Sequence, residues 1–172
     1  PSLDVDSPET TVTSDNIADL VSQCDIDRSV KPSKVYHGGT KAGRKRLTHF
    51  IRGILPHYDK TRNEPSFDGV SRLSPYLHFG FLSIQEVVDA VERANAPKSA
   101  KEAFLEQAIV RRELSFNFTR HNRHYDSLNS LPDWALKTMR DHADDARPNL
   151  LGDEKIEKAE TYDELWNAAQ RE

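Results

Sequence analysis

The sequence of 172 residues predicts an all-α fold, and three observations support this. Apolar residues recur at the spacing of a helix face, most clearly in the stripe Leu47, Phe50, Ile51 and Ile54. Two further apolar runs follow capping-box patterns, at residues 83–86 and 99–102. The sequence has no sustained period-two alternation of β-branched residues, which is the pattern typical of strands.

Composition divides the chain into an arm and a helical region. Residues 1–15 are rich in Ser, Thr, Pro and Asp, so we expect them to lack a core of their own. Ser14 or Asp15 is expected to cap a short helix that ends near Val21. We therefore predict a linker or arm over residues 1–36 and a helical domain over residues 37–172.

Start signals place the helices of this domain. Thr40 is expected to cap the helix that carries the apolar stripe. Ser83 and Ser99 are expected to cap the next two helices, the second of which runs to about Thr119. Pro132 marks the start of a further helix, because proline suits a first helical turn.

The last helix and the connecting segments follow from the same signals. The pattern Thr161–Glu164 is expected to open the last helix. Trp134 is predicted to lie in the core. Loops are predicted over residues 55–70, 120–131 and 143–154.

Charge is unevenly distributed along a chain whose net charge is −4 and whose mean hydropathy is −0.74. Residues 31–62 carry nine Lys and Arg against one acid, Asp59, which gives this segment a net charge of +8 and the remainder −12. A local basic segment on an acidic chain indicates a polyanionic partner. A solvated helix face explains the same pattern equally well.

Composition also argues against several classes of protein. The sequence has no run of 18 apolar residues, the length needed to span a membrane, and no signal-peptide core is visible. Cys24 is the single cysteine, which excludes an internal disulfide and a cysteine metal cluster. The seven histidines lack ligand spacing, so no metal site is predicted. We expect a cytosolic or nuclear location.

Two segments carry residues suited to an anionic ligand. In SRLSPYLHFG, the side chains of Ser71, Arg72 and Ser74 offer donors before Pro75, at a turn that leads into a helix, which suits a phosphate group. A polar loop before a core helix is the alternative. In the helix over residues 104–118, paired arginines interrupt apolar residues and indicate either a bound anion or internal pairing with glutamate.

Four segments of the chain resemble class II cyclobutane-pyrimidine-dimer DNA photolyases over roughly residues 26–172. They are DRSVKPSKVYHGGTKAG, YDKTRNEPSFDGVSRLSPYLHFG, FLEQAIVRRELSFNF and the tail that ends in ETYDELWNAAQ. The resemblance implies the photolyase/cryptochrome-type helical FAD-binding domain, truncated to the linker and the first half of that domain. It also implies FAD as cofactor, UV-damaged DNA as partner and repair by light-driven electron transfer to a flipped-out dimer.

The resemblance assigns roles to individual residues. Five of them resemble contacts to FAD: Tyr58, Ser71, Leu73, Ser74 and Arg111. Arg62 resembles a contact to the DNA backbone beside the dimer, and Trp166 resembles a member of the tryptophan chain that photoreduces the flavin. Gln107 stands where the family usually has a second acid that contacts the dimer, and an amide cannot supply an acidic proton.

Two other functions remain open. One is a cryptochrome-like flavoprotein without repair activity, and the other is a cofactor-free helical module that binds DNA through the basic segment. The chain begins without Met and ends in a helical pattern, so we expect it to be part of a longer protein. Most of the family's flavin contacts would follow its end, so we expect the isolated chain to bind FAD poorly and to be inactive.

Overall fold

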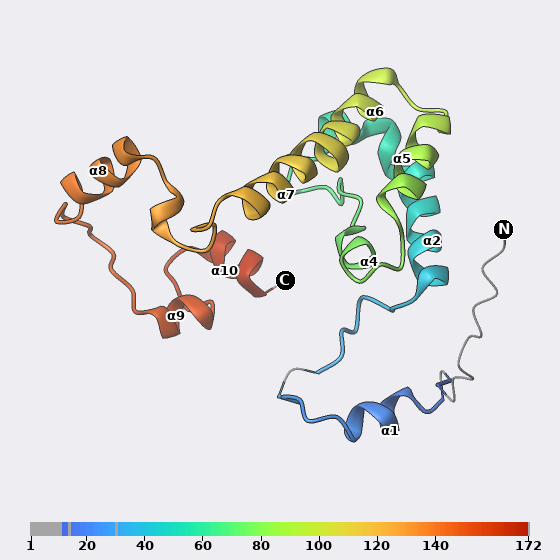
Figure 1. The fold of residues 1–172 in the computed structure, drawn as a ribbon, viewed down its shortest axis with the longest axis horizontal. Helices are drawn as coiled ribbons and strands as arrows, with labels where there is room; N and C mark the ends of the chain where they lie inside the picture. Colours follow the sequence, from blue (N-terminus) through green and yellow to red (C-terminus); the bar gives the residue numbers. More distant parts are fainter. Residues whose placement is uncertain (1–11, 14, 30, 172) are drawn as a thin grey trace. The chain divides into compact units, whose positions relative to one another are not determined.

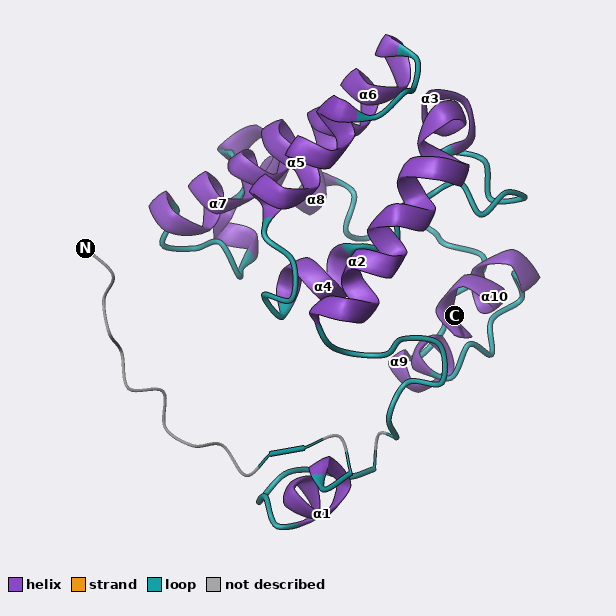
Figure 2. Ribbon diagram, turned by 90° about the vertical axis from the view of Figure 1, so that its right-hand side faces the viewer, coloured by secondary structure: helices purple, strands orange, loops and turns teal. Residues whose placement is uncertain are grey.

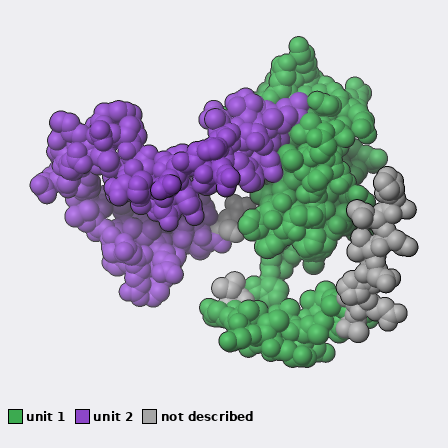
Figure 3. All heavy atoms as spheres, in the orientation of Figure 1, with its two compact units in different colours: residues 1–104 green, residues 105–172 purple. Residues whose placement is uncertain are grey.

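A computed structural model describes residues 12–13, 15–29 and 31–171 of the chain. Every regular element in these ranges is a helix, which confirms the all-α prediction (Figure 2). The chain divides into two compact units, residues 1–104 and residues 105–172 (Figure 3). The predicted division at residue 36 stays a prediction.

The first unit is a set of short helices (Figure 1). An ion pair at 2.7 Å joins Arg44 of α2 (Thr40–His49) to Glu86 of α5 (Ile84–Arg93). In chain order they are α1 (Ile17–Ser22), α2 (Thr40–His49), the π-helical turn η1 (Phe50–Ile54), the 3-10 turn η2 (Leu55–His57), α3 (Tyr58–Thr61), α4 (Ser74–His78), α5 (Ile84–Arg93) and α6 (Lys98–Leu105), whose last residue belongs to the second unit.

The apolar stripe forms the centre of this unit, as predicted. Leu47, Phe50 and Ile54 are buried, and Ile51 is half-buried. Each turn of α2 and η1 therefore contributes one apolar side chain to the same face. The largest side chains with almost no exposure are Phe50, Leu55, Leu73, Val87 and Val91.

The predicted helix caps are correct at one position of the first unit and wrong at others. The Ser83 hydroxyl accepts the Glu86 N–H at 3.0 Å and caps α5, as expected. Asn16, rather than Asp15, precedes α1, and Ser14 lies outside the described residues. Thr40 is the first residue of α2 rather than its cap, because the carbonyl of Gly39 already accepts the Gly43 N–H.

Ser99 lies inside α6, and the predicted cap there is wrong. Helical hydrogen bonding begins earlier, because the Pro97 carbonyl accepts the Lys101 N–H at 3.1 Å. The Ser99 hydroxyl donates instead to Asp59 Oδ2 at 2.8 Å, which joins α6 to α3. The predicted loop over residues 55–70 is also too long, because η2 and α3 occupy residues 55–61.

The second unit consists of further helices on residues 105–172. They are the π-helical turn η3 (Glu106–Arg111), α7 (Arg112–His121), the 3-10 turn η4 (Leu128–Ser130), α8 (Asp133–Asp141), α9 (Asp153–Glu157) and α10 (Glu164–Arg171). As predicted, Pro132 directly precedes α8. α10 begins at Glu164 rather than Thr161, because Asp163 Oδ1 accepts the Trp166 N–H at 3.0 Å. Trp134 is 73% exposed, so its predicted place in the core is wrong.

Candidate functional site

Tyr58 begins α3 and is buried in an aromatic cluster of the first unit. Its ring meets Phe50 at a centroid distance of 5.8 Å and Phe104 at 5.4 Å, both nearly edge to face. Aromatic rings prefer this arrangement because the positive edge of one ring faces the negative face of the other. Burial raises the pKa of the Tyr58 phenol, and the nearby Arg62 charge opposes that shift. The cluster fixes the start of α3.

Arg62 follows Tyr58 by one helical turn and contacts it. Its guanidinium lies 5.9 Å from the centre of the Tyr58 ring, and Nη1 donates to the Ala103 carbonyl at 3.2 Å. Its Nε atom is buried and has no hydrogen-bond partner among the residues that the structure describes. A buried donor of this kind is costly unless an acceptor meets it. Arg62 is thus held at the end of α3, and its Nε–H remains available to an acceptor.

The segment between α3 and α4 is pinned against α3 at Gly69. A Cβ atom at Gly69 would lie 2.5 Å from the Thr61 carbonyl oxygen, closer than any side chain allows. Glycine is therefore required for the close approach of the two backbones. This contact joins the segment that precedes the predicted phosphate turn, residues 71–74, to the last residue of α3.

Arg46 of α2 holds the same segment from another side. Its Nε donates to the Ser71 carbonyl at 2.8 Å, and its Nη2 donates to the Val70 carbonyl at 3.1 Å. Arg72, which follows Ser71, has a φ angle of 54°, a conformation that non-glycine residues seldom adopt. Arg72 also pairs with Asp68 at 2.9 Å. Sequence reasoning missed Arg46, because its partners are backbone atoms 24 and 25 residues away.

The three turn residues with a predicted role face different surroundings. Ser71 is half-buried, and its hydroxyl oxygen accepts the Leu73 N–H at 3.4 Å. The Leu73 side chain is 1% exposed and belongs to the core, so only its backbone is suited to a ligand. Ser74 is exposed at the start of α4, and Pro75 follows it. Hydroxyl donors are therefore available at Ser71 and Ser74.

In the second unit, Gln107 and Arg111 share the π-helical turn η3. Hydrogen bonds in such a turn join residues five apart, and these turns are frequent at functional sites. The spacing explains why Arg111 Nε lies 3.5 Å from Glu106 Oε1, five residues earlier, rather than beside Gln107. Arg112 pairs with Glu113 at 3.0 Å. The predicted internal pairing with glutamate is therefore confirmed, and the Arg111 side chain is exposed rather than buried.

Trp166 lies on α10 and is 39% exposed. The adjacent Asn167 is 3% exposed and was missed by sequence reasoning. Its Oδ1 accepts the Thr161 N–H at 2.9 Å and the Thr161 hydroxyl at 2.7 Å, and its Nδ2 donates to the Thr161 carbonyl at 2.8 Å. These bonds fix the turn that precedes the helix of Trp166. An asparagine within an amphipathic pattern was the available signal.

The predicted site residues are divided between the two compact units. Tyr58, Arg62 and the turn over residues 71–74 lie in the first unit, while Gln107, Arg111 and Trp166 lie in the second. In the first unit, the Gly69 contact joins the segment before the turn to Thr61, which lies between Tyr58 and Arg62 in the chain. That both sets form one site stays a prediction.

Two further properties concern the described residues only. Within these ranges, no helix combines the length and the apolar character that crossing a membrane demands. In the same ranges, no group of three or more His, Cys, Asp or Glu side chains is placed to hold a metal ion.

Comparisons with known proteins identify relatives. No protein-family model matches the chain. It is 44% identical over 147 residues, 84% of its length, to the deoxyribodipyrimidine photo-lyase of Potorous tridactylus. It is 38% identical over 155 residues, 90% of its length, to the protein of the same name from Methanothermobacter thermautotrophicus. The chain spans 27% and 34% of these two relatives. A stretch of 59 residues is 39% identical to Cryptochrome-1 of Arabidopsis thaliana.

Proposed function

Because the chain is homologous to part of the deoxyribodipyrimidine photo-lyases, we propose that it supplies part of the flavin-binding and DNA-binding surface of a light-driven repair enzyme. The observation that carries this proposal is identity of 38–44% over 84–90% of the chain to two proteins of that name. The class II assignment is part of the proposal, and it rests on the four segments quoted above.

The donor set of the first unit fits a dinucleotide cofactor. Ser71 and Ser74 offer hydroxyl donors at the turn that leads into α4. Phosphate oxygens are acceptors that such donors satisfy. FAD, when bound and reduced, supplies the electron that light drives into a pyrimidine dimer.

In this proposal the protein residues bind, orient and exclude water. Ser71 and Ser74 hold the phosphate region of FAD, and the Leu73 side chain anchors that turn in the core. Tyr58, which is held in the aromatic cluster, contacts the diphosphate region of FAD, and Arg111 adds positive charge near the cofactor phosphates. Trp166 passes electrons toward the cofactor, and Arg62 contacts the DNA backbone. Gln107 contacts the dimer through its amide, which donates and accepts hydrogen bonds without ionising.

A chimera tests the proposal. The 147 aligned residues of the Potorous tridactylus photo-lyase are replaced by those of this chain. We expect the chimera to retain flavin absorbance and to remove dimers from an irradiated oligonucleotide in blue light but not in darkness. A folded chimera that binds flavin without repairing dimers would refute the repair function and favour the cryptochrome-like alternative, to which the similarity with Cryptochrome-1 points.

The same chimera isolates the role of Gln107. We expect Gln107→Glu to raise the repair rate by about 10-fold or more, because a carboxyl group restores a proton donor at the dimer. Gln170→Glu is the matched control, since Gln170 is also exposed in the second unit. An equal change in both variants, or none in either, would show that Gln107 does not contact the dimer.

A further inference from the structure

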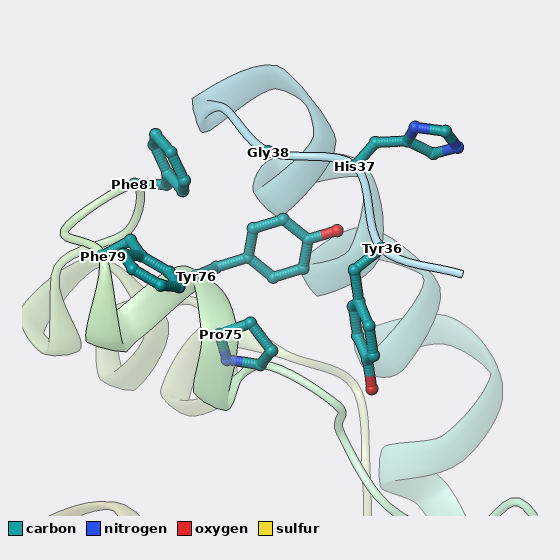
Figure 4. Close-up of a pocket in the computed structure, with 7 residues that line it drawn as sticks. All are labelled: Tyr36, His37, Gly38, Pro75, Tyr76, Phe79 and Phe81. Carbon is teal, nitrogen blue, oxygen red and sulfur yellow. The ribbon is translucent and has the colours of Figure 1, made fainter. Parts of the chain in front are cut away.

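An aromatic pocket of the first unit lies outside the residues assigned to the cofactor. It has a volume of about 340 Å³ and is lined mainly by the rings of Tyr36, Pro75, Tyr76, Phe79 and Phe81. Figure 4 shows these side chains around one space, with the Tyr76 hydroxyl directed toward the segment that holds Tyr36 and His37. The volume is in the range of small-molecule sites, roughly 300–1,000 Å³.

The backbone after α4 is shaped to present two of these rings. Gly80 has φ 71, which turns the chain between Phe79 and Phe81, and the Leu82 N–H donates to the Tyr76 carbonyl at 3.1 Å. The two phenylalanine rings lie 6.4 Å apart. Phe79 is nevertheless 69% exposed. An exposed aromatic ring that lines an aromatic pocket suits a ligand that has a flat face.

A second pocket adjoins the first and is basic. It has a volume of about 310 Å³, and it shares His37 and Tyr76 with the aromatic pocket. The cationic residues that line it are Lys45 and Arg46 of α2. Both belong to the segment of net charge +8. An apolar surface and a cationic surface therefore meet at Tyr76.

We propose that these two pockets bind one nucleotide of a single DNA strand, with the base in the aromatic pocket and its phosphate in the basic pocket. Stacking of bases on aromatic rings beside a positively charged groove is how many proteins hold single strands. An apolar peptide would fill the aromatic pocket without needing Lys45 and Arg46, so charge complementarity favours the nucleic acid.

Binding of labelled oligothymidylate in darkness, measured by fluorescence anisotropy, tests the base pocket. We expect Phe79→Ala to weaken binding by about tenfold or more, the effect of losing one stacked base. Phe67→Ala is the matched control, because Phe67 is 62% exposed and does not line the pocket. With an abasic strand of the same length, Phe79→Ala should have no effect.

The phosphate contact has its own test. Lys45→Gln should weaken binding of the oligothymidylate and of the abasic strand alike. It should also reduce the slope of log affinity against log salt by about 0.7, the value for one phosphate on a single strand. Lys60→Gln removes the same charge from the same basic segment but outside the pocket. Equal effects of Phe79→Ala and Phe67→Ala, an effect of Phe79→Ala on the abasic strand, or equal effects of the two lysine variants would overturn the proposal.

These measurements use undamaged DNA and no flavin, so they are independent of the repair assay. A chimera that fails to split dimers leaves the nucleotide site standing if the Phe79 and Lys45 results are as expected. Absence of oligothymidylate binding by the wild-type chain refutes the nucleotide site and leaves the repair proposal to its own test. Far-UV circular dichroism of each variant, expected to match the wild type, shows that the helices are retained.

Discussion

At the scale of single residues, the buried phenol of Tyr58 makes the free energy of unfolding sensitive to pH in the alkaline range. Burial raises its pKa above the ordinary value of 10.0 in the folded chain. In the unfolded chain the phenol loses its proton from about pH 10, which favours unfolding. The contribution of Tyr58 to stability is therefore intact below about pH 10 and is lost as the pH rises through the raised pKa.

Tyr58→Phe tests this. We expect the difference in free energy of unfolding between wild type and Tyr58→Phe to shift in favour of the variant above pH 10, because phenylalanine does not titrate. Urea unfolding at pH 8 and at pH 10.5 provides the measurement. All other residues are the same in both proteins, so their contributions cancel in the comparison. A difference that stays constant with pH would mean that the phenol is not shielded from water.

A second residue-scale prediction concerns Arg46 and the segment before α4. Arg46→Gln should lower the free energy of unfolding by about 2 kcal/mol, because it removes charge-assisted hydrogen bonds to the carbonyls of Val70 and Ser71. Urea unfolding monitored by far-UV circular dichroism measures the loss. Arg44→Gln, which breaks an exposed ion pair with Glu86, is the control and should have a much smaller effect. Equal losses would mean that the segment is held without Arg46.

Single residues also show where sequence reasoning stopped. Trp134 is predicted to lie in the core, yet on α8 it is 73% exposed. An α-helix would bring Arg111 beside Gln107, four residues earlier. The π-helical turn changes that geometry, and its effect is visible in the pairing of Glu106 with Arg111. Local sequence does not specify such a turn, because it depends on how the helix packs.

At the scale of elements, the contribution of the α5 cap to the free energy of unfolding can be measured. Ser83→Ala should lower the free energy of unfolding by about 1 kcal/mol, because the Glu86 N–H loses its acceptor. Ser83→Asp keeps an acceptor at the same position and should leave stability nearly unchanged. Chemical denaturation of the three proteins separates a capping role from a general effect of substitution. Equal destabilisation by alanine and aspartate would contradict the cap.

The two capping-box patterns explain why element boundaries were predicted only in part. Ser83 and Ser99 have the same local signature, with a glutamate three residues later. Pro97 begins helical hydrogen bonding ahead of Ser99, and Asp59 then accepts the Ser99 hydroxyl from a distant helix. The first cap depends on neighbours in sequence and was predictable. The alternative at Ser99 depends on a partner 40 residues away, and periodicity gives no information about it.

At the scale of the whole molecule, the fold class follows from the sequence while the site follows only in part. Helical spacing alone predicts all-α, and it places Leu47, Phe50 and Ile54 in the core. The predicted turn over residues 71–74 begins α4 as expected. The contacts that hold it come from Arg46 and from Thr61 through Gly69, which are tertiary and backbone contacts. Whether Arg111 joins the same site stays a prediction.

The distribution of buried apolar residues predicts unequal stability of the two units. Among the described residues, the buried apolar side chains lie between Leu47 and Phe104, with Ala159 as the exception in the second unit. Helices α7 and α8 instead expose Leu114, Phe116 and Trp134. Because burial of apolar surface supplies most of the free energy that opposes local opening, the second unit should open more readily.

Amide hydrogen exchange measures this difference directly. We expect the amides of α5 around Val87 and Val91 to exchange more slowly than those of α7 and α8, since the first two side chains are fully buried. Fluorescence of Trp134 and Trp166, both in the second unit, should change at a lower urea concentration than protection in α5 is lost. Equal protection in both units, with coincident transitions, would mean that the chain unfolds as one cooperative body and that exposure of α7 and α8 does not weaken them.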